Sequence, residues 1–154
     1  MNKPTPIKQM YSLKMDFSDK NMEPFKVHTG YQTAEKFFIH RLELGFEANK
    51  CFYVASLNGN NEIIAYTKLY SGTDKRVTWV PREILQFALL TNASKIITAH
   101  NNTLGIVKPS RDTIKLVQDL ESACNLIGIE LLNHFIVSGI DFSSLSELGH
   151  VTSN

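Results

Sequence analysis

His100 is the residue whose type and position most strongly suggest chemistry. It ends an apolar segment, SKIITAH at 94–100, and the loop 101–109 separates it from Ser110, a good helix N-cap. A side chain at the end of a sheet strand, facing a helix N-terminus, is a common place for a functional site. A catalytic zinc ion needs three protein ligands, an open position and a carboxylate that takes a proton from the bound water. His100 is therefore a candidate metal ligand.

The remaining residues offer no second ligand by spacing. The loop after His100 contains no histidine, and its first carboxylate is Asp112 in the first turn of the expected helix. No HExxH, GxSxG, GxxxxGK[ST] or GxGxxG pattern occurs. Cys51 and Cys124 lie in apolar runs without a CxxC pair, which predicts buried thiols in a reducing compartment. The other histidines fit surface or hydrogen-bonded structural roles, and they are His28, His40, His134 and His150.

Composition predicts one globular domain in the cytoplasm. The chain has 154 residues, is 43% hydrophobic and carries a net charge of +1, which gives no general attraction to nucleic acid or acidic membranes. The N-terminus lacks an apolar signal-peptide core, and no apolar run is long enough to span a membrane. Some cations could gather near Trp79 as a nucleic-acid surface, although scattered, solvated charges are the simpler interpretation: Lys75, Arg76, Arg82, Lys95 and Lys108.

Apolar periodicity predicts an α/β (α+β) fold around one sheet. The expected strands cover 10–17, 50–57, 62–70, 94–100 and 130–139. The expected helices begin at Thr33, Pro81 and Ser110, and the last ends at Gly128. The core-facing residues of the second and third helices are expected to be Ile84, Leu85, Ala88, Leu89, Ile114, Val117, Leu120, Cys124 and Ile127. Residues 1–9 are expected to be a flexible N-terminus, 10–149 the domain and 150–154 a tail.

The segment 72–120, GTDKRVTWVPREILQFALLTNASKIITAHNNTLGIVKPSRDTIKLVQDL, resembles the RadC family of bacterial JAB/MPN domains. That family reads GTLN-x-V-x-V-x-PREV, a helix ending in LNAA, then a strand leading to AHNHPSGDPTPSxxD. LIGIELLNHFIVSG is similar to the family's LLGIxLLDHxIVG, and FSSLSELG looks like its closing strand and helix. The resemblance spans about 10–149 and implies a JAB/MPN, cytidine-deaminase-like mixed sheet flanked by helices. It implies a short form, without room for the helix-hairpin-helix segment of longer RadC proteins.

The resemblance also identifies a zinc-hydrolase site in which several residues are replaced. Family hydrolases use two histidines and an aspartate as zinc ligands, a serine for the oxyanion and an upstream glutamate for the proton. The first histidine corresponds to His100 and the serine to Ser110, and both are kept. The second histidine corresponds to Asn102 and the aspartate to Thr113. The glutamate corresponds to Thr67.

These replacements imply that the zinc chemistry is lost. Asp112 lies one residue from the aspartate position, about 100° around a helix, and Glu62 lies roughly 16 Å along a strand from the glutamate position. We therefore expect no catalytic residue at Thr67 or Ser110, no metal at His100, Asn102 and Thr113, and no cofactor. Zinc would return only if the site were rearranged.

Three functional hypotheses remain open. The first is a catalytically degenerate RadC-like MPN domain that binds an unidentified protein partner or a second copy of itself as a homodimer. Its contact surface would be the apolar loop residues Thr103, Leu104, Ile106 and Val107. The second is a zinc-dependent metallopeptidase or isopeptidase that uses His100, Asp112 and a histidine from elsewhere. The third is a nucleic-acid-associated role, from the DNA-repair label of the family, which the neutral charge disfavours.

Overall fold

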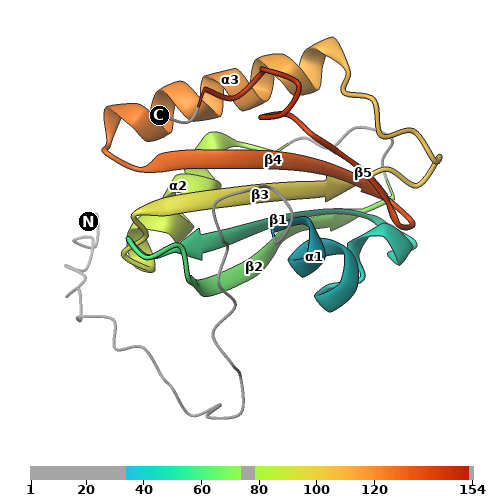
Figure 1. The fold of residues 1–154 in the computed structure, drawn as a ribbon, viewed down its shortest axis with the longest axis horizontal. Helices are drawn as coiled ribbons and strands as arrows, with labels where there is room; N and C mark the ends of the chain where they lie inside the picture. The colour runs from blue at the N-terminus through green and yellow to red at the C-terminus, as the bar shows by residue number, and fades with distance from the viewer. Residues whose placement is uncertain (1–33, 74–78, 153–154) are drawn as a thin grey trace, which may run out of the picture.

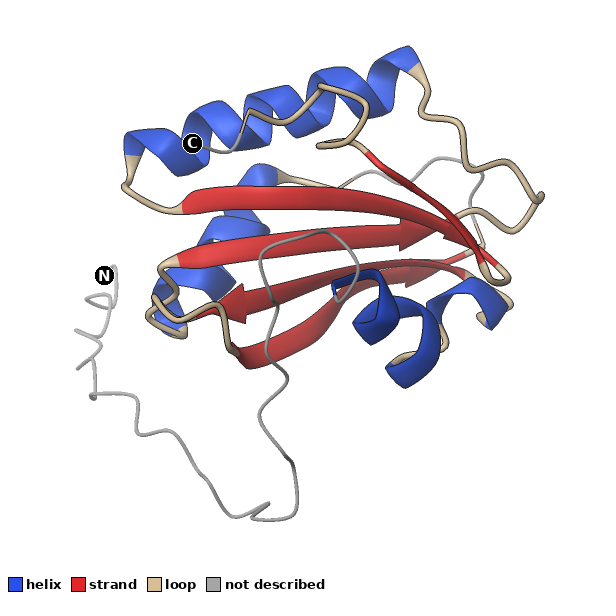
Figure 2. Ribbon diagram, viewed as in Figure 1, coloured by secondary structure: helices blue, strands red, loops and turns tan. Residues whose placement is uncertain are grey.

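A five-stranded mixed sheet forms the centre of the molecule in the computed structural model, which describes residues 34–73 and 79–152 (Figures 1 and 2). The strand order is β2-β1-β3-β4-β5. The strands are β1 (Lys50–Leu57), β2 (Ile63–Gly72), β3 (Lys95–Asn101), β4 (Glu130–Ser138) and β5 (Asp141–Ser144). With its flanking helices this is the α+β arrangement expected from the sequence. The expected strand 10–17 and the N-cap at Thr33 lie outside the described residues.

A tight hairpin joins β1 to β2, as the Asn-Gly-Asn-Asn turn predicts. Asn58 organises this turn, because its Oδ1 accepts hydrogen bonds from the backbone N–H groups of Asn60 and Glu62. Asn61 has a φ of 62°, a left-handed conformation that asparagine adopts more readily than most residues. The two strands then pair antiparallel from Leu57↔Ile63 to Lys50↔Gly72.

The crossover from β3 through α3 (Arg111–Leu126) to β4 positions the candidate site. Because β3 and β4 are parallel neighbours, the ends of both strands lie at the same edge of the sheet. Their register pairs Thr98 with His134 and His100 with Ile136. Ser110 caps α3 by accepting a hydrogen bond from the N–H of Thr113, as predicted.

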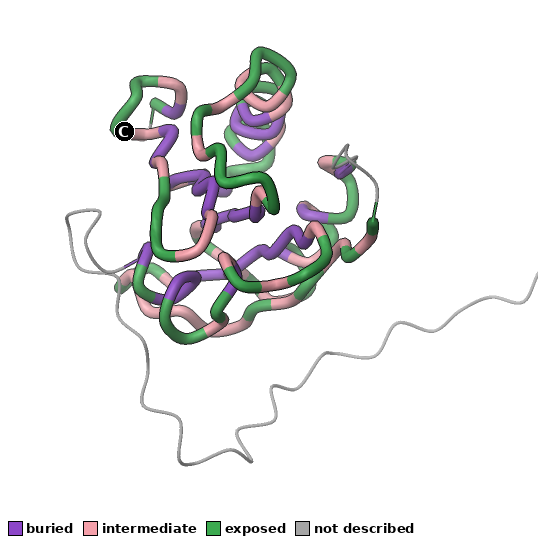
Figure 3. The backbone as a smooth tube through the Cα atoms, turned by 90° about the vertical axis from the view of Figure 1, so that its right-hand side faces the viewer, coloured by how far each residue is buried: buried purple, intermediate pink, exposed green. Residues whose placement is uncertain are grey.

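The sheet is covered on both faces, so it has two hydrophobic cores. Figure 3 shows buried chain running through the middle of the molecule between these layers. On one face α2 (Pro81–Leu90) and α3 pack over residues that include Phe52, Trp79, Ile84, Leu120 and Leu131. The other face is covered by the helical segment 34–46, whose buried residues include Phe37, Phe38 and Leu44.

The segment 34–46 is helical but not one α-helix. It consists of α1 (Ala34–Lys36), a π-helical turn (Phe37–Arg41) and a 3-10 turn (Leu44–Phe46). The N–H of Leu42 donates to the carbonyl of Phe37, which is the wide spacing of a π-turn. Phe37, Phe38 and Ile39 are all buried, and three consecutive residues exceed the apolar stripe of one α-helical face. The helix type changes along this segment because consecutive bulky side chains are all buried, which one regular α-helix would not achieve.

Three expectations about side chains and ends were wrong. Leu89 and Ile127 were placed toward the core, but they are 61% and 42% exposed. The closing segment forms β5 followed by turns at 145–149, without the final helix. Gly128 ends α3 as predicted, with a φ of 75°.

In the described ranges no helix is long and apolar enough to cross a membrane.

Candidate functional site

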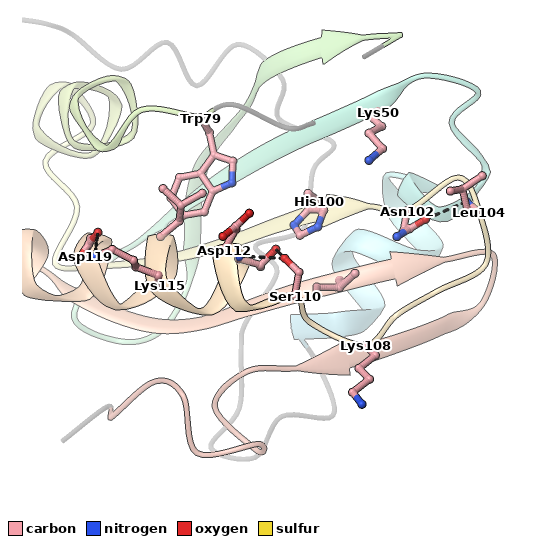
Figure 4. Close-up of a pocket in the computed structure, with 13 residues that line it drawn as sticks. Lys50, Trp79, His100, Asn102, Leu104, Lys108, Ser110, Asp112, Lys115 and Asp119 are labelled. Atoms are coloured by element: carbon pink, nitrogen blue, oxygen red, sulfur yellow. Dashed lines mark hydrogen bonds and ion pairs between the residues drawn. The ribbon is translucent and has the colours of Figure 1, made fainter. Parts of the chain in front are cut away.

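A cavity of about 620 Å³ opens between the end of β3 and the first turns of α3 (Figure 4). The sheet contributes His100 from β3 and Ile136 from β4, and Lys50 lies at the start of β1. Trp79 forms another wall just before α2. The remaining lining residues come from the loop after β3 and from α3, and they include Asn102, Leu104, Lys108, Ser110, Asp112, Thr113, Lys115, Leu116 and Asp119.

His100 is held in the cavity wall by a buried hydrogen-bonded chain. Its Nδ1 shares a 2.8 Å hydrogen bond with Nε2 of His134. The Nδ1 of His134 shares a second 2.8 Å hydrogen bond with the hydroxyl of Thr98. Both histidines and Thr98 are buried. The chain uses both ring nitrogens of His134 and leaves only Nε2 of His100 for the cavity.

Burial keeps both imidazoles neutral near pH 7. Desolvation, with a smaller contribution from the nearby positive charge of Lys50, lowers the pKa of His100 to about 4. Desolvation and the neighbouring His100 place the pKa of His134 well below its usual value. The stacked rings of Trp79 and Phe52 exclude water from His134, since each ring centroid lies 5.9 Å from its imidazole.

Two neutral histidines can distribute their protons along this chain in two ways. In one, His134 donates to Thr98 and His100 donates to His134, which leaves a lone pair on Nε2 of His100. In the other, Thr98 donates to His134 and His134 donates to His100, which leaves an N–H at the same atom. The His100 face of the cavity can therefore accept or donate without any change in total charge.

Local structural bonds are made by the three residues that the family resemblance assigns to ligand and oxyanion positions, Asn102, Ser110 and Thr113. Asn102 Oδ1 accepts from the N–H of Leu104, an Asx turn that shapes the loop. Ser110 and Thr113 share a 2.9 Å hydrogen bond between their hydroxyls, and Ser110 also caps α3. All three lie in the cavity wall, where the two hydroxyls and the Asn102 Oδ1 each have a hydrogen-bond partner.

The two carboxylates considered as substitutes differ in their position. Asp112, one residue from the family's aspartate position, lines the same cavity as His100. Glu62 lies at the β1–β2 turn, where it accepts a hydrogen bond from the side chain of Asn58. Thr67 lies in β2, the edge strand of the sheet, where it pairs with Val54 of β1. It is not part of the cavity lining.

Comparison with known proteins places the chain in a family. Residues 29–150 match the family model described as RadC-like JAB domain. The chain is similar to UPF0758 proteins from Leptothrix cholodnii, 38% identical over 109 residues, and from Streptococcus sanguinis, 38% identical over 105 residues. These alignments cover 71% and 68% of this chain and 49% and 46% of those proteins. The chain belongs to the RadC-like JAB family. It spans about half the length of the curated relatives it matches.

The residues of this RadC-like JAB domain do not fit a zinc ion at the family's position. A metal there would meet one imidazole nitrogen from His100, while Asn102, Ser110 and Thr113 offer an amide and hydroxyls that are weak ligands. Among the described residues, no three histidine, cysteine, aspartate or glutamate side chains are grouped closely enough to hold one ion. His134 cannot complete the set because both its nitrogens are engaged.

Sequence reasoning missed His134, Trp79 and Lys50 as parts of the site. His134 had been treated as a strand residue with no helpful spacing, but the β3–β4 pairing brings it against His100. The available signal was the alternation in two parallel neighbouring strands, which aligns every second residue on one face. Of the cations considered for a nucleic-acid surface, Lys108 lines the cavity and Lys95 pairs with Glu130 at 3.6 Å. Lys75 and Arg76 lie outside the described residues.

Proposed function

We propose that this RadC-like JAB domain is a protein-binding module that no longer performs zinc-dependent hydrolysis. The observation that carries the proposal is the set of possible metal ligands in the cavity: one available imidazole nitrogen at His100 and two carboxylates, Asp112 and the Lys115-paired Asp119. Hydrolysis by zinc needs three ligands, an open position and a base. The framework around the cavity, in contrast, is complete, with a capped α3 and a continuous sheet.

The loop beside the cavity supplies the contact surface in this proposal. Leu104 is 71% exposed and Ile106 is 54% exposed, whereas Val107 packs on the core. The loop has a defined shape because Asn102 bonds to Leu104, Gly105 has a φ of 79°, and Ser143 donates to the carbonyl of Val107. A shaped loop with exposed apolar side chains loses little conformational entropy when a partner covers it. The partner is therefore a protein that presents an apolar segment to this loop.

Metal uptake tests the loss of hydrolysis. The wild-type domain, purified without chelator and dialysed against zinc, should retain far less than one zinc ion per chain by elemental analysis. A Thr67→Glu, Asn102→His, Thr113→Asp variant places the family's residues at the three replaced positions. With His100 it has three zinc ligands, so it should retain one zinc ion. A Thr67→Ala, Asn102→Ala, Thr113→Ala variant is the matched control, because it changes the same positions without adding ligands.

Stoichiometric zinc in the wild-type domain, together with peptide or isopeptide cleavage that a chelator abolishes, would contradict the proposal. It would instead support a rearranged metallohydrolase built on His100 and Asp112. A folded triple variant without zinc would show that the family positions are wrongly assigned in this chain.

A further inference from the structure

The cavity that holds a metal cation in hydrolytic relatives has hydrogen-bond donors here. We propose that it binds the carboxylate group of a peptide, with the peptide's apolar neighbour against the loop. This inference rests on the proposed protein-binding function and adds the chemistry that the partner must present. Three features carry it: a buried indole N–H that faces the cavity, the first turn of α3, and the charges of the lining.

Trp79 is the feature that points most directly to a ligand. Its side chain is only 5% exposed and is fixed by stacking on Phe52 at 4.9 Å between centroids. In Figure 4 its indole nitrogen is turned toward the space between Trp79 and His100. The indole nitrogen has no hydrogen-bond partner in the described part of the chain. It is not fully buried either, because Glu35 Oε2 is the single fully buried side-chain polar atom without a partner there, so the nitrogen is open to the cavity. An indole N–H can only donate, and it therefore needs an acceptor.

The first turn of α3 adds backbone donors to the same cavity. Ser110 satisfies the N–H of Thr113, and within the described residues the N–H groups of Arg111 and Asp112 have no protein acceptor. The positive end of the helix dipole favours an anion at this position. His100 can add a donor without gaining a proton, because the chain through His134 to Thr98 can present an N–H at Nε2.

The charges of the lining favour a single negative charge. Lys115 is paired with Asp119 at 3.3 Å. Counted together, the three lysines and two aspartates of the lining give it one net positive formal charge, and they are Lys50, Lys108, Lys115, Asp112 and Asp119. A carboxylate matches this charge, whereas a phosphate dianion would be poorly balanced against Asp112. No arginine, the usual bidentate partner of phosphate, lines the cavity among the described residues.

The apolar part of the lining indicates what the carboxylate is attached to. Leu104, Leu116 and Ile136 lie in the same wall as the donors. A pocket of this kind prefers a ligand that has an apolar body and one polar group. A peptide that ends in an apolar residue has both, and so does an acidic side chain beside an apolar one. The shared chemistry is a peptide carboxylate next to an apolar side chain.

Trp79 also makes the test direct, because it is the only tryptophan in the chain. Acetyl-leucyl-leucine with a free carboxylate is titrated into the wild-type protein while Trp79 fluorescence is recorded, and calorimetry gives the affinity. A saturable change is expected, and the C-terminal amide of the same peptide should bind at least about tenfold more weakly, because it lacks the charge. Acetyl-glutamyl-leucine amide tests the second source: tight binding assigns the site to either carboxylate, and weak binding assigns it to chain ends.

Two variants and one control connect the binding to this cavity. Lys50→Met and Trp79→Phe should each weaken binding several-fold by calorimetry, since one removes a charge and the other a donor while keeping an aromatic ring. Lys36→Met removes the same charge from an exposed position on α1, across the sheet from the cavity, and should bind like wild type. Thermal melts establish that each variant is folded.

The inference is overturned if the acid and the amide bind equally, if both cavity variants bind like wild type, or if inorganic phosphate binds more tightly than the peptide. Its failure is distinct from that of the proposed function. A domain that binds neither zinc nor carboxylate loses only this inference, whereas stoichiometric zinc with hydrolysis removes the protein-binding proposal whatever the peptides do.

Discussion

At the scale of single residues, His100, His134 and Thr98 form a hydrogen-bonded chain in the cavity wall. In a zinc site a second group commonly bonds to the ligating imidazole and fixes its orientation. His134 bonds directly to His100 and Thr98 bonds to His134, which is support of this kind. Its effect in this structure is to hold an uncharged imidazole in the cavity wall.

The buried, neutral His100 should make the protein less stable in weak acid. The pKa of His100 is about 4 in the folded protein and about 6.5 in the unfolded chain. The unfolded state therefore binds a proton first as the pH falls, so stability is complete above pH 6.5 and declines until the pH approaches 4. Between pH 7.5 and 5.0, His100 alone should lower the free energy of unfolding by roughly 2 kcal/mol. Urea unfolding at both pH values measures this change.

A His100→Gln variant is the matched control for that prediction. Glutamine does not titrate, so the variant should lose less stability between the two pH values than the wild type. The comparison also subtracts carboxyl groups that titrate in acid, such as Glu35, whose pKa is raised by burial. Equal losses in both proteins would show that His100 is not held neutral.

At the scale of elements, α3 depends on Ser110 for structure. The Ser110 hydroxyl accepts from the Thr113 N–H at 3.1 Å, which satisfies one of the free donors of the first turn. Ser110→Ala should lower the free energy of unfolding by about 1 kcal/mol, and Ser110→Asp should retain most of it because aspartate is also a good cap. Chemical denaturation at neutral pH measures both.

Ser122 offers a control within the same helix. Its hydroxyl donates to the carbonyl of Gln118 on the exposed face, a bond that adds little to helix stability. Ser122→Ala should therefore change the free energy of unfolding by less than about 0.5 kcal/mol. If both alanine variants were equally destabilised, the cap would not explain the effect of Ser110.

Local sequence signals predicted the elements better than the contacts between them. The Asn-Gly turn, Pro81 at a helix start and the Ser110 cap each act within a few residues, and the structure has the expected element at each. The segment 34–46 does not keep the 3.6-residue repeat of a single α-helix, because adjacent bulky residues are buried there. The bond between His100 and His134 depends on strand neighbours that are 34 residues apart, which no local pattern specifies.

Four of the five positions that the family resemblance singles out lie together in the structure, whereas Thr67 lies apart, and the side-chain interactions were not predicted. His100, Asn102, Ser110 and Thr113 all line one cavity, because the strand-loop-helix order fixes where they lie. Asp112, one residue from the family's aspartate position, also lines the cavity, because a first-turn residue at a cavity mouth can line it from either side of the helix end. The donor role of Trp79 could not be predicted, because it depends on which atom of a buried ring remains without a partner.

At the scale of the whole molecule, the two faces of the sheet have different roles. The face covered by 34–46 is closed by buried aromatic rings, including Phe37 against Phe38 at 5.3 Å between centroids. The other face has the cavity between the end of β3 and the first turns of α3 (Figure 4). Beside it the loop leaves Leu104 and Ile106 exposed to solvent. Removing exposed apolar groups affects binding more than folding, so this loop can be altered without disturbing either core.

A Leu104→Ser, Ile106→Ser variant tests this division of roles. Because both side chains are exposed in the free protein, the free energy of unfolding should change by less than about 0.5 kcal/mol. Binding of acetyl-leucyl-leucine should weaken several-fold, since the apolar contact is lost while the donors remain. Leu126→Ser, at a leucine that is 88% exposed at the end of α3, should change neither quantity. Calorimetry and urea unfolding of the three proteins give both numbers, and a loop variant that binds like wild type would place the apolar contact elsewhere on the molecule.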